Sequence, residues 1–265
     1  MKYAIALFVF VLFASATVDA TESKYDISLG TEVSRISYKE PGIMRQDGTM
    51  YGVTGSVGYR DNLMLKAEGR YAFGTVDYSS PISGTMNDID DYILEGRGLV
   101  GYEIPLKLFG ADVTPFTGIA YRYLNNDMSG KITSVGHFGF ERESNYWYSP
   151  LGVELRKEFA QGWSAVFSGE LDIFWKGRQV NHIGHIPSYV DFTNKQETGF
   201  GQRVSLDIVK DTGNMRISVG PFLRHWNIRM SNEAVGAYIT PEIPINFIEP
   251  QNSSMEVGVK VAVKF

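Results

Sequence analysis

The amino-acid sequence predicts an all-β fold, an antiparallel transmembrane β-barrel of about ten strands. Three observations favour it: apolar and polar residues alternate with a period of two, no apolar run long enough for a membrane helix follows the N-terminal segment, and short turns alternate with longer loops. A period of two places successive side chains on opposite faces of a strand. Only helices and closed barrels satisfy every backbone hydrogen bond in lipid, so the pattern indicates a barrel.

The N-terminal segment has the features of a secretory signal peptide. Lys2 supplies the positive charge, an uncharged apolar stretch follows, and Val18 and Ala20 place small residues at the −3 and −1 positions of a cleavage site. The alternative is an N-terminal helix that is not cleaved. We therefore expect a signal peptide at 1–20 and a single barrel domain at 21–265.

Composition narrows the classes of protein. The chain has no cysteine and a formal net charge of −5. Without cysteine, a lipoprotein-type anchor, a disulfide scaffold and a thiolate metal site are excluded. Mild acidity does not favour binding to nucleic acid. We expect no cofactor, no metal site and no nucleic-acid partner.

Alternation locates the strands. They are expected, in chain order, at 24–38, 48–60, 63–77, 88–103, 112–125, 144–157, 162–176, 198–210, 214–228 and 254–265. Several of them put an apolar face opposite a charged one, as Leu63, Leu65 and Ala67 alternate with Lys66 and Glu68. In the last strand the apolar face comprises Met255, Val257, Val259, Val261, Val263 and Phe265. An apolar outer face with a polar interior inverts the pattern of a soluble barrel.

The connections follow the outer-membrane pattern, with short turns at one end and long loops at the other. Short turns are expected at 60–62, 160–162 and 210–214, and long loops at 39–47, 78–87, 126–143, 177–197 and 229–253. The segment 103–112 is the least defined turn. Eight or twelve strands would also fit, because such patterns locate strand boundaries only to within a few residues.

Aromatic residues gather near the ends of the expected strands. They are Tyr59, Tyr71, Phe73, Tyr92, Tyr102, Tyr121, Tyr123, Trp147, Trp163 and Trp175. Rings with a polar edge favour the membrane–water interface, although such residues are also enriched in strands of any kind. If the facing is right, an Asp at Val259 or Leu171 blocks assembly, and the same change at the inward Gly258 is milder.

The expected inward face carries charges of both signs in near balance. Its principal members are Lys66, Glu68, Arg70, Glu95, Arg97, Arg122, Glu154, Arg156, Glu170 and Asp172. On neighbouring strands, Glu68 and Arg70 could pair with Arg97 and Glu95, because buried charges need partners. The charges indicate either a salt-bridged core that fills a narrow barrel or a small water-filled channel.

The signal peptide, the alternating hairpins and the ending Glu256 to Phe265 resemble the small outer-membrane β-barrel proteins of Gram-negative bacteria. The resemblance implies location in the cell outer membrane, contact with outer-membrane lipid and lipopolysaccharide, and passage through periplasmic chaperones to the barrel-assembly machinery. It also implies that Val261, Val263 and Phe265 belong to the C-terminal signal which that machinery reads. An extracellular ligand, if there is one, is not indicated.

A weaker resemblance is to the omptins, which are ten-stranded outer-membrane proteases. It implies an Asp pair on one wall of the barrel mouth facing an Asp–His pair on the other, an arrangement suited to general-base activation of water. The corresponding loops of this chain supply Asp88, Asp90, Asp91, His182 and His185. The chain departs from the omptin pattern because Val180, not Asp, stands two positions before His182.

The sequence thus predicts an outer-membrane barrel with a structural or surface-interaction role and no catalysis. A narrow channel is the first alternative and an omptin-like hydrolase the second. The loops 126–143 and 229–253 contain apolar residues that could bind a partner or fold back over the barrel mouth.

Overall fold

The computed structural model describes residues 24–106, 110–240 and 243–265. The expected signal peptide lies outside the described residues. Among the residues described, no helix has the length and apolar character needed to cross a membrane.

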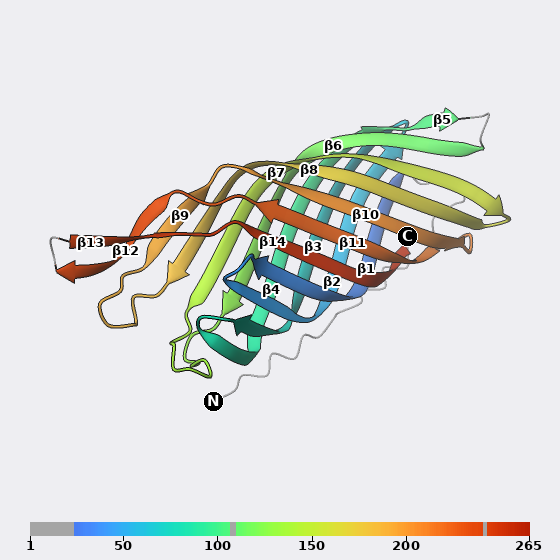
Figure 1. The fold of residues 1–265 in the computed structure, drawn as a ribbon. Coiled ribbons are helices and arrows are strands. Elements are labelled where there is room, and N and C mark those ends of the chain that lie inside the picture. Colours follow the sequence, from blue (N-terminus) through green and yellow to red (C-terminus); the bar gives the residue numbers. More distant parts are fainter. Residues whose placement is uncertain (1–23, 107–109, 241–242) are drawn as a thin grey trace.

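Ten antiparallel strands form a closed barrel (Figure 1). They are β1 (Tyr25–Glu40), β2 (Met44–Asp61), β3 (Leu63–Ser80), β4 (Gly84–Tyr102), β6 (Ala111–Asp127), β7 (Glu141–Ala160), β8 (Trp163–His182), β10 (Gly199–Asp211), β11 (Arg216–Ile228) and β14 (Asn252–Lys264). Each pairs with the next, and β14 closes the barrel by pairing with β1. The expected count of ten is confirmed.

Four shorter strands extend this barrel. At the turn end, β5 (Ile104–Leu106) continues from β4 and pairs with β6. β5 lies in the segment 103–112, which was the least defined turn in the sequence. At the loop end, β9 (Phe192–Gln196) pairs with β8, and β12 (Glu233–Thr240) forms a hairpin with β13 (Ile243–Ile248). This hairpin projects from the barrel at the end opposite the C terminus (Figure 1).

Side-chain facing follows the predicted alternation. Val259 and Leu171 are 45% and 43% exposed on the outer face, whereas Glu256 and Asp172, on the same strands, are 3% and 0% exposed inside. Apolar side chains therefore meet lipid and charged side chains fill the lumen, as expected of a membrane barrel.

Two of the expected long loops, 39–47 and 78–87, are wrong. Residues 41–43 join β1 to β2 and residues 81–83 join β3 to β4, so most of both segments is strand. Each turn contains a proline, and a glycine at positive φ stands in or directly after it (Gly42 φ 76°, Gly84 φ 81°). Proline and positive-φ glycine allow tight reversals, so these polar segments extend their hairpins rather than forming loops.

The expectation for Gly258 is also wrong. Gly258 does face inward, but a Cβ at this position would collide with the backbone carbonyl of Val33 and come within 2.7 Å of the Phe222 ring. Backbone cannot yield as a flexible side chain can, so any substitution here is disruptive whatever its polarity.

Buried apolar residues form two layers in the loop-side half of the lumen. One cluster comprises Ile36, Met50, Ala72, Val76, Met86, Ile89, Ile93, Leu124 and Met128. The other comprises Ala120, Tyr146, Tyr148, Phe174, Trp226 and Ile228. A small third cluster of Met64, Leu99 and Phe116 lies toward the turn end. Side chains thus pack the lumen instead of lining an open bore.

Candidate functional site

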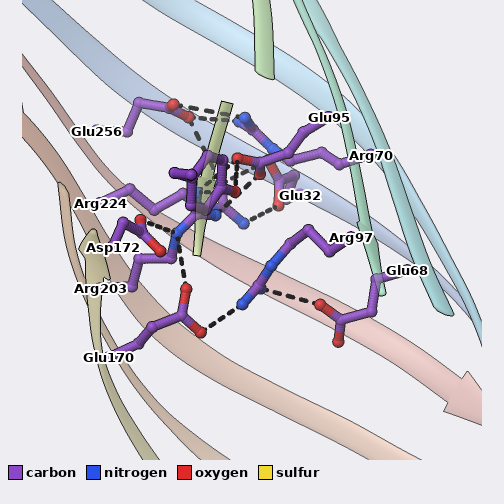
Figure 2. A network of polar contacts seen from close by, with 11 residues as sticks. Glu32, Glu68, Arg70, Glu95, Arg97, Glu170, Asp172, Arg203, Arg224 and Glu256 are labelled. Atoms are coloured by element: carbon purple, nitrogen blue, oxygen red, sulfur yellow. Dashed lines mark hydrogen bonds and ion pairs between the residues drawn. The ribbon is translucent and has the colours of Figure 1, made fainter. Parts of the chain in front are cut away.

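A network of buried ion pairs crosses the lumen (Figure 2). Its first half centres on Arg70 of β3. The Arg70 Nε donates to Glu32 of β1 over 2.6 Å, and its Nη2 donates to Glu256 of β14. Arg224 of β11 donates to both oxygens of Glu32 over 3.0 and 2.9 Å. Each carboxylate is held by two guanidinium groups, which offsets the cost of removing its charge from water.

The second half centres on Arg203 of β10. Its Nε donates to Asp172 over 2.8 Å and its Nη1 donates to Glu95 over 2.8 Å. The Tyr148 hydroxyl accepts from Arg203 and donates to Glu95, each over 2.7 Å. Asp172 is fully buried and Glu95 is 4% exposed, so these charges depend on one another rather than on solvent.

Arg97 extends this half toward the turn end. It donates to Glu68 of β3 over 2.9 Å and to Glu170 of β8, and Lys66 lies 2.7 Å from the other Glu68 oxygen. The two halves together, here called the central network, join side chains from β1, β3, β4, β7, β8, β10, β11 and β14. The central network therefore ties opposite walls of the barrel across the lumen.

The structure forms some of the predicted pairs and not others. The Glu68–Arg97 ion pair is present. The Arg70–Glu95 pair is not formed, because Arg70 bonds Glu32 and Glu256 while Glu95 bonds Arg203. Alternation gives the face of each charge, but partners that reach across the lumen depend on strand tilt and stagger, which the sequence pattern does not contain.

Arg122 and Arg156 do not join the central network. Arg122 is 2% exposed, and its guanidinium lies 5.9 Å from the Tyr146 ring and 5.6 Å from the Trp226 ring. Arg122 faces inward as expected, and its charge is met by cation–π contacts with these two rings. Within the described part of the chain, neither arginine makes an ion pair. Glu154, in contrast, pairs with Arg60 over 3.0 Å.

A second tie closes the extracellular mouth. Arg142 of β7 donates to Glu40 of β1 over 2.8 Å and to Glu249, which follows β13. The Tyr38 hydroxyl, which has one proton to donate, lies 3.1 Å from an oxygen of each of these two carboxylates. We call these four residues the outer clamp. Because β1 and β7 lie half-way round the barrel from each other, the outer clamp spans the mouth.

The outer clamp places two carboxylates around one guanidinium. Burial and the nearby charge of Glu40 raise the pKa of Glu249 to about 7, although Arg142 opposes the rise. Sequence reasoning did not single out this cluster. The sequence indicates only the inward parity of Tyr38 at the end of the expected strand 24–38, since Glu40, Arg142 and Glu249 all fell in segments expected to be loops.

The turn-side half of the lumen contains a cavity of about 320 Å³. All ten barrel strands contribute to its wall, and the central network forms its inner end through Arg70, Glu95 and Arg203. Near the turns its wall includes Arg60, Arg156 and Arg216. The lumen is thus packed on the extracellular side and hollow on the periplasmic side.

The structure does not bring the candidate hydrolase residues together. Asp90 faces outward and Asp91 inward, because consecutive residues of β4 alternate there, and a register irregularity at Asp88 (φ 55°) lies just before them. By register, Asp90 and His182 lie in one outward row, three strands apart. At about 4.8 Å per strand this separates them by ~14 Å along the wall, too far to share a water.

The two histidines make other contacts. His182 Nε2 lies 3.0 Å from Glu143, and its Nδ1 lies 3.7 Å from Asp191. Partial burial lowers the His182 pKa, but the hydrogen bond with Glu143 and the charges of the surrounding carboxylates raise it overall. His185 Nε2 lies 3.2 Å from the Gly139 carbonyl oxygen. Both contacts attach the loop after β8 to its neighbours.

The residues expected to carry the assembly signal lie on the closing strand. Val261 and Phe265 are 45% and 58% exposed. Through Val261 and Val263, β14 pairs with β1 on one side and with β11 on the other. Recognition of these residues by the assembly machinery stays a prediction.

Comparison with known proteins supports the location and the fold. No family model matches the sequence. A segment of 97 residues, 36% of this chain, is 35% identical to an outer membrane protein of Gluconacetobacter diazotrophicus, and the match spans 25% of the length of that relative. The chain therefore corresponds to about a quarter of that protein.

Among solved structures, the outer membrane protease OmpT of Escherichia coli is similar in fold. The TM-score is 0.67 over 91% of this chain and 95% of OmpT, at 10% sequence identity. Identity this low shows the fold alone. The chain is thus an outer-membrane β-barrel protein, located in the cell outer membrane, with a closed ten-stranded fold like that of OmpT.

Proposed function

We propose that this protein is a closed, non-catalytic barrel that stabilises the outer membrane and presents its loops and the β12–β13 hairpin at the cell surface. The observation that carries this proposal is the occlusion of the lumen by successive layers. The outer clamp spans the mouth, apolar clusters lie beneath it, and the central network follows.

The layers differ from the lining of a selective pore. Pores favour a continuous polar wall with a ring of one charge sign. Here Arg203 is bound by Glu95 and Asp172, and Trp226 packs against Tyr148 with ring centroids 4.9 Å apart. Moving ions past these groups would require several buried ion pairs to open together, each at a cost of several kcal/mol.

Single-channel recording in a planar bilayer tests the proposal. With insertion confirmed by protease protection, the protein is expected to give no discrete conductance steps. Reproducible openings would instead support the narrow channel. In that case Glu95→Gln, which loosens Arg203, should lengthen the openings, whereas Glu158→Gln, an exposed position on β7, should leave them unchanged.

Surface contacts form the second part of the proposal. Exposed cations stand on the outer face toward the loop end, including Arg35 and Lys39 on β1 and Lys176 and Arg178 on β8. Phosphate groups of lipopolysaccharide would meet them there. A rise in melting temperature on adding lipopolysaccharide, reduced in Arg178→Gln, would support this contact. Passage through periplasmic chaperones and the assembly machinery belongs to the same proposal.

A further inference from the structure

Among the described residues that line the periplasmic cavity, every basic side chain except one arginine takes part in an ion pair. Every other Lys or Arg of the cavity wall has a carboxylate within 4.0 Å. Arg156 of β7 lines the same wall and makes no ion pair with any residue that the structure describes. It is half-buried, so solvent screens its charge only in part.

The positively charged neighbours of Arg156 favour an anion beside it. The positive charges of Arg216 and Arg60 repel Arg156, and the negative charges of Glu154 and Glu103 attract it. Both of these carboxylates are already held by Arg60, over 3.0 and 3.1 Å. Three guanidinium groups therefore line the periplasmic end of the cavity, and one of them, Arg156, makes no ion pair with any residue that the structure describes.

The chain places one further carboxylate beside Arg156 but does not use it. Asp112 of β6 stands directly opposite Arg156 in the strand register. No ion pair forms between them, and Asp112 is not part of the cavity wall. The Arg156 side chain thus lines the cavity rather than pairing with its strand neighbour.

We propose that Arg156, with Arg60 and Arg216, binds a small oxyanion bearing a phosphate group in the periplasmic cavity. The planar guanidinium fork matches phosphate oxygens, and a doubly charged anion suits a site with more than one arginine. The volume of about 320 Å³ exceeds the ~10–15 Å³ that one water needs, so a small anion and some water fit together. The phosphate comes from free phosphate or from a lipid headgroup at the inner leaflet.

Arg156→Gln tests the site in the full-length barrel, reconstituted in phosphatidylcholine nanodiscs. Inorganic phosphate should raise the melting temperature of the unmodified protein above that in sodium chloride of equal ionic strength, because a ligand that binds the native state stabilises it. Arg156→Gln should weaken phosphate binding at least tenfold. It breaks no ion pair and removes a like-charge contact, so the variant should fold at least as well.

Two further variants control the result. Lys157 is the exposed, outward-facing neighbour of Arg156, so Lys157→Gln should leave binding unchanged. Asp112→Asn removes the carboxylate that stands opposite Arg156 in the strand register without pairing with it, so this variant should not weaken binding. Phosphatidylglycerol discs without free phosphate separate the sources: a lipid headgroup in the site would stabilise the unmodified protein and not Arg156→Gln. Absence of stabilisation by either source, or equal stabilisation in Arg156→Gln, would overturn the proposal.

Discussion

The carboxyl group of Glu249 makes the extracellular mouth sensitive to pH. The pKa of Glu249 in the folded protein is about 7, above the ordinary value of 4.5. Between pH 4.5 and pH 7, Glu249 therefore keeps its proton in the folded state and loses it in the unfolded state. The stabilisation is therefore complete below about pH 4.5 and is lost as the pH rises through 7. Above that, two carboxylates share Arg142.

This linkage predicts that the β12–β13 hairpin becomes more accessible to protease as the pH rises from 5 to 8, within the window that the Glu249 pKa sets. Glu249→Gln should flatten this dependence. His182, whose pKa is also raised, adds a dependence of the same sign, so both proteins are best compared in a His182→Gln background. An unchanged pH profile in Glu249→Gln would contradict the role of the outer clamp.

Glu256 shows what a buried charge costs when its partner is removed. It lies 3% exposed between Arg70 and Arg224. Glu256→Gln should lower the free energy of unfolding by about 3–5 kcal/mol, because two guanidinium groups lose part of their counter-charge inside the barrel. Urea unfolding in lipid vesicles measures this. Glu158→Gln, at an exposed position, should change it by less than about 0.5 kcal/mol, and similar values for the two variants would argue against a network that bears on stability.

At the scale of the strand, facing decides which substitutions the barrel tolerates. Val259→Asp puts a charge on the lipid face of the closing strand and should impair assembly, at a cost below the ~2–4 kcal/mol of Arg or Lys at the bilayer centre. Ala262→Asp is the matched control, because Ala262 lines the cavity on the same strand and should accept a carboxylate among Lys and Arg. Heat-modified mobility on a gel reports assembly, and a normally assembled Val259→Asp would refute the assigned facing.

Strands were predictable because the alternation of polar and apolar residues within each strand shows which side chains face inward and which face outward. The last strand, from Met255 to Phe265, needed no knowledge of its neighbours. The turns at Gly42 and Gly84 were not recovered, since a few polar residues around a Pro–Gly pair read equally as loop or hairpin. The expected strands therefore stopped short of the extracellular end, and the expected start at 144 also left Arg142 of β7 outside its strand.

The candidate site was predictable only in part. The inward parity of Glu68, Glu95 and Arg97 follows from alternation, and so does the mixed charge of the lumen. The partners of Arg70 and the pairing of Arg203 with Glu95 follow from closure, because strand tilt brings together residues that are two to four strands apart. For Arg122, Tyr146 stands opposite it on the neighbouring strand β7, whereas Trp226 comes from β11, which no local pattern could associate with β6.

For the whole molecule, the two halves of the lumen differ in how completely side chains fill them. The extracellular half is packed with side chains and tied by the outer clamp, while the periplasmic half holds a cavity. Similarity to the OmpT barrel concerns the strands alone, since Asp90 and His182 stand apart on the outer wall.

The pairing of Arg70 with Glu32 and Glu256 also bears on the order of events when the barrel forms. Glu32 belongs to the first strand and Glu256 to the last, so Arg70 has both partners only after the two ends of the sheet have met. A chain that lacked β14, or inserted before it was aligned, would leave Arg70 and Arg224 with half of their counter-charge. Barrel closure and the neutralisation of these buried charges therefore happen together, so a truncated or misregistered barrel keeps two buried guanidinium groups short of counter-charge and is less stable.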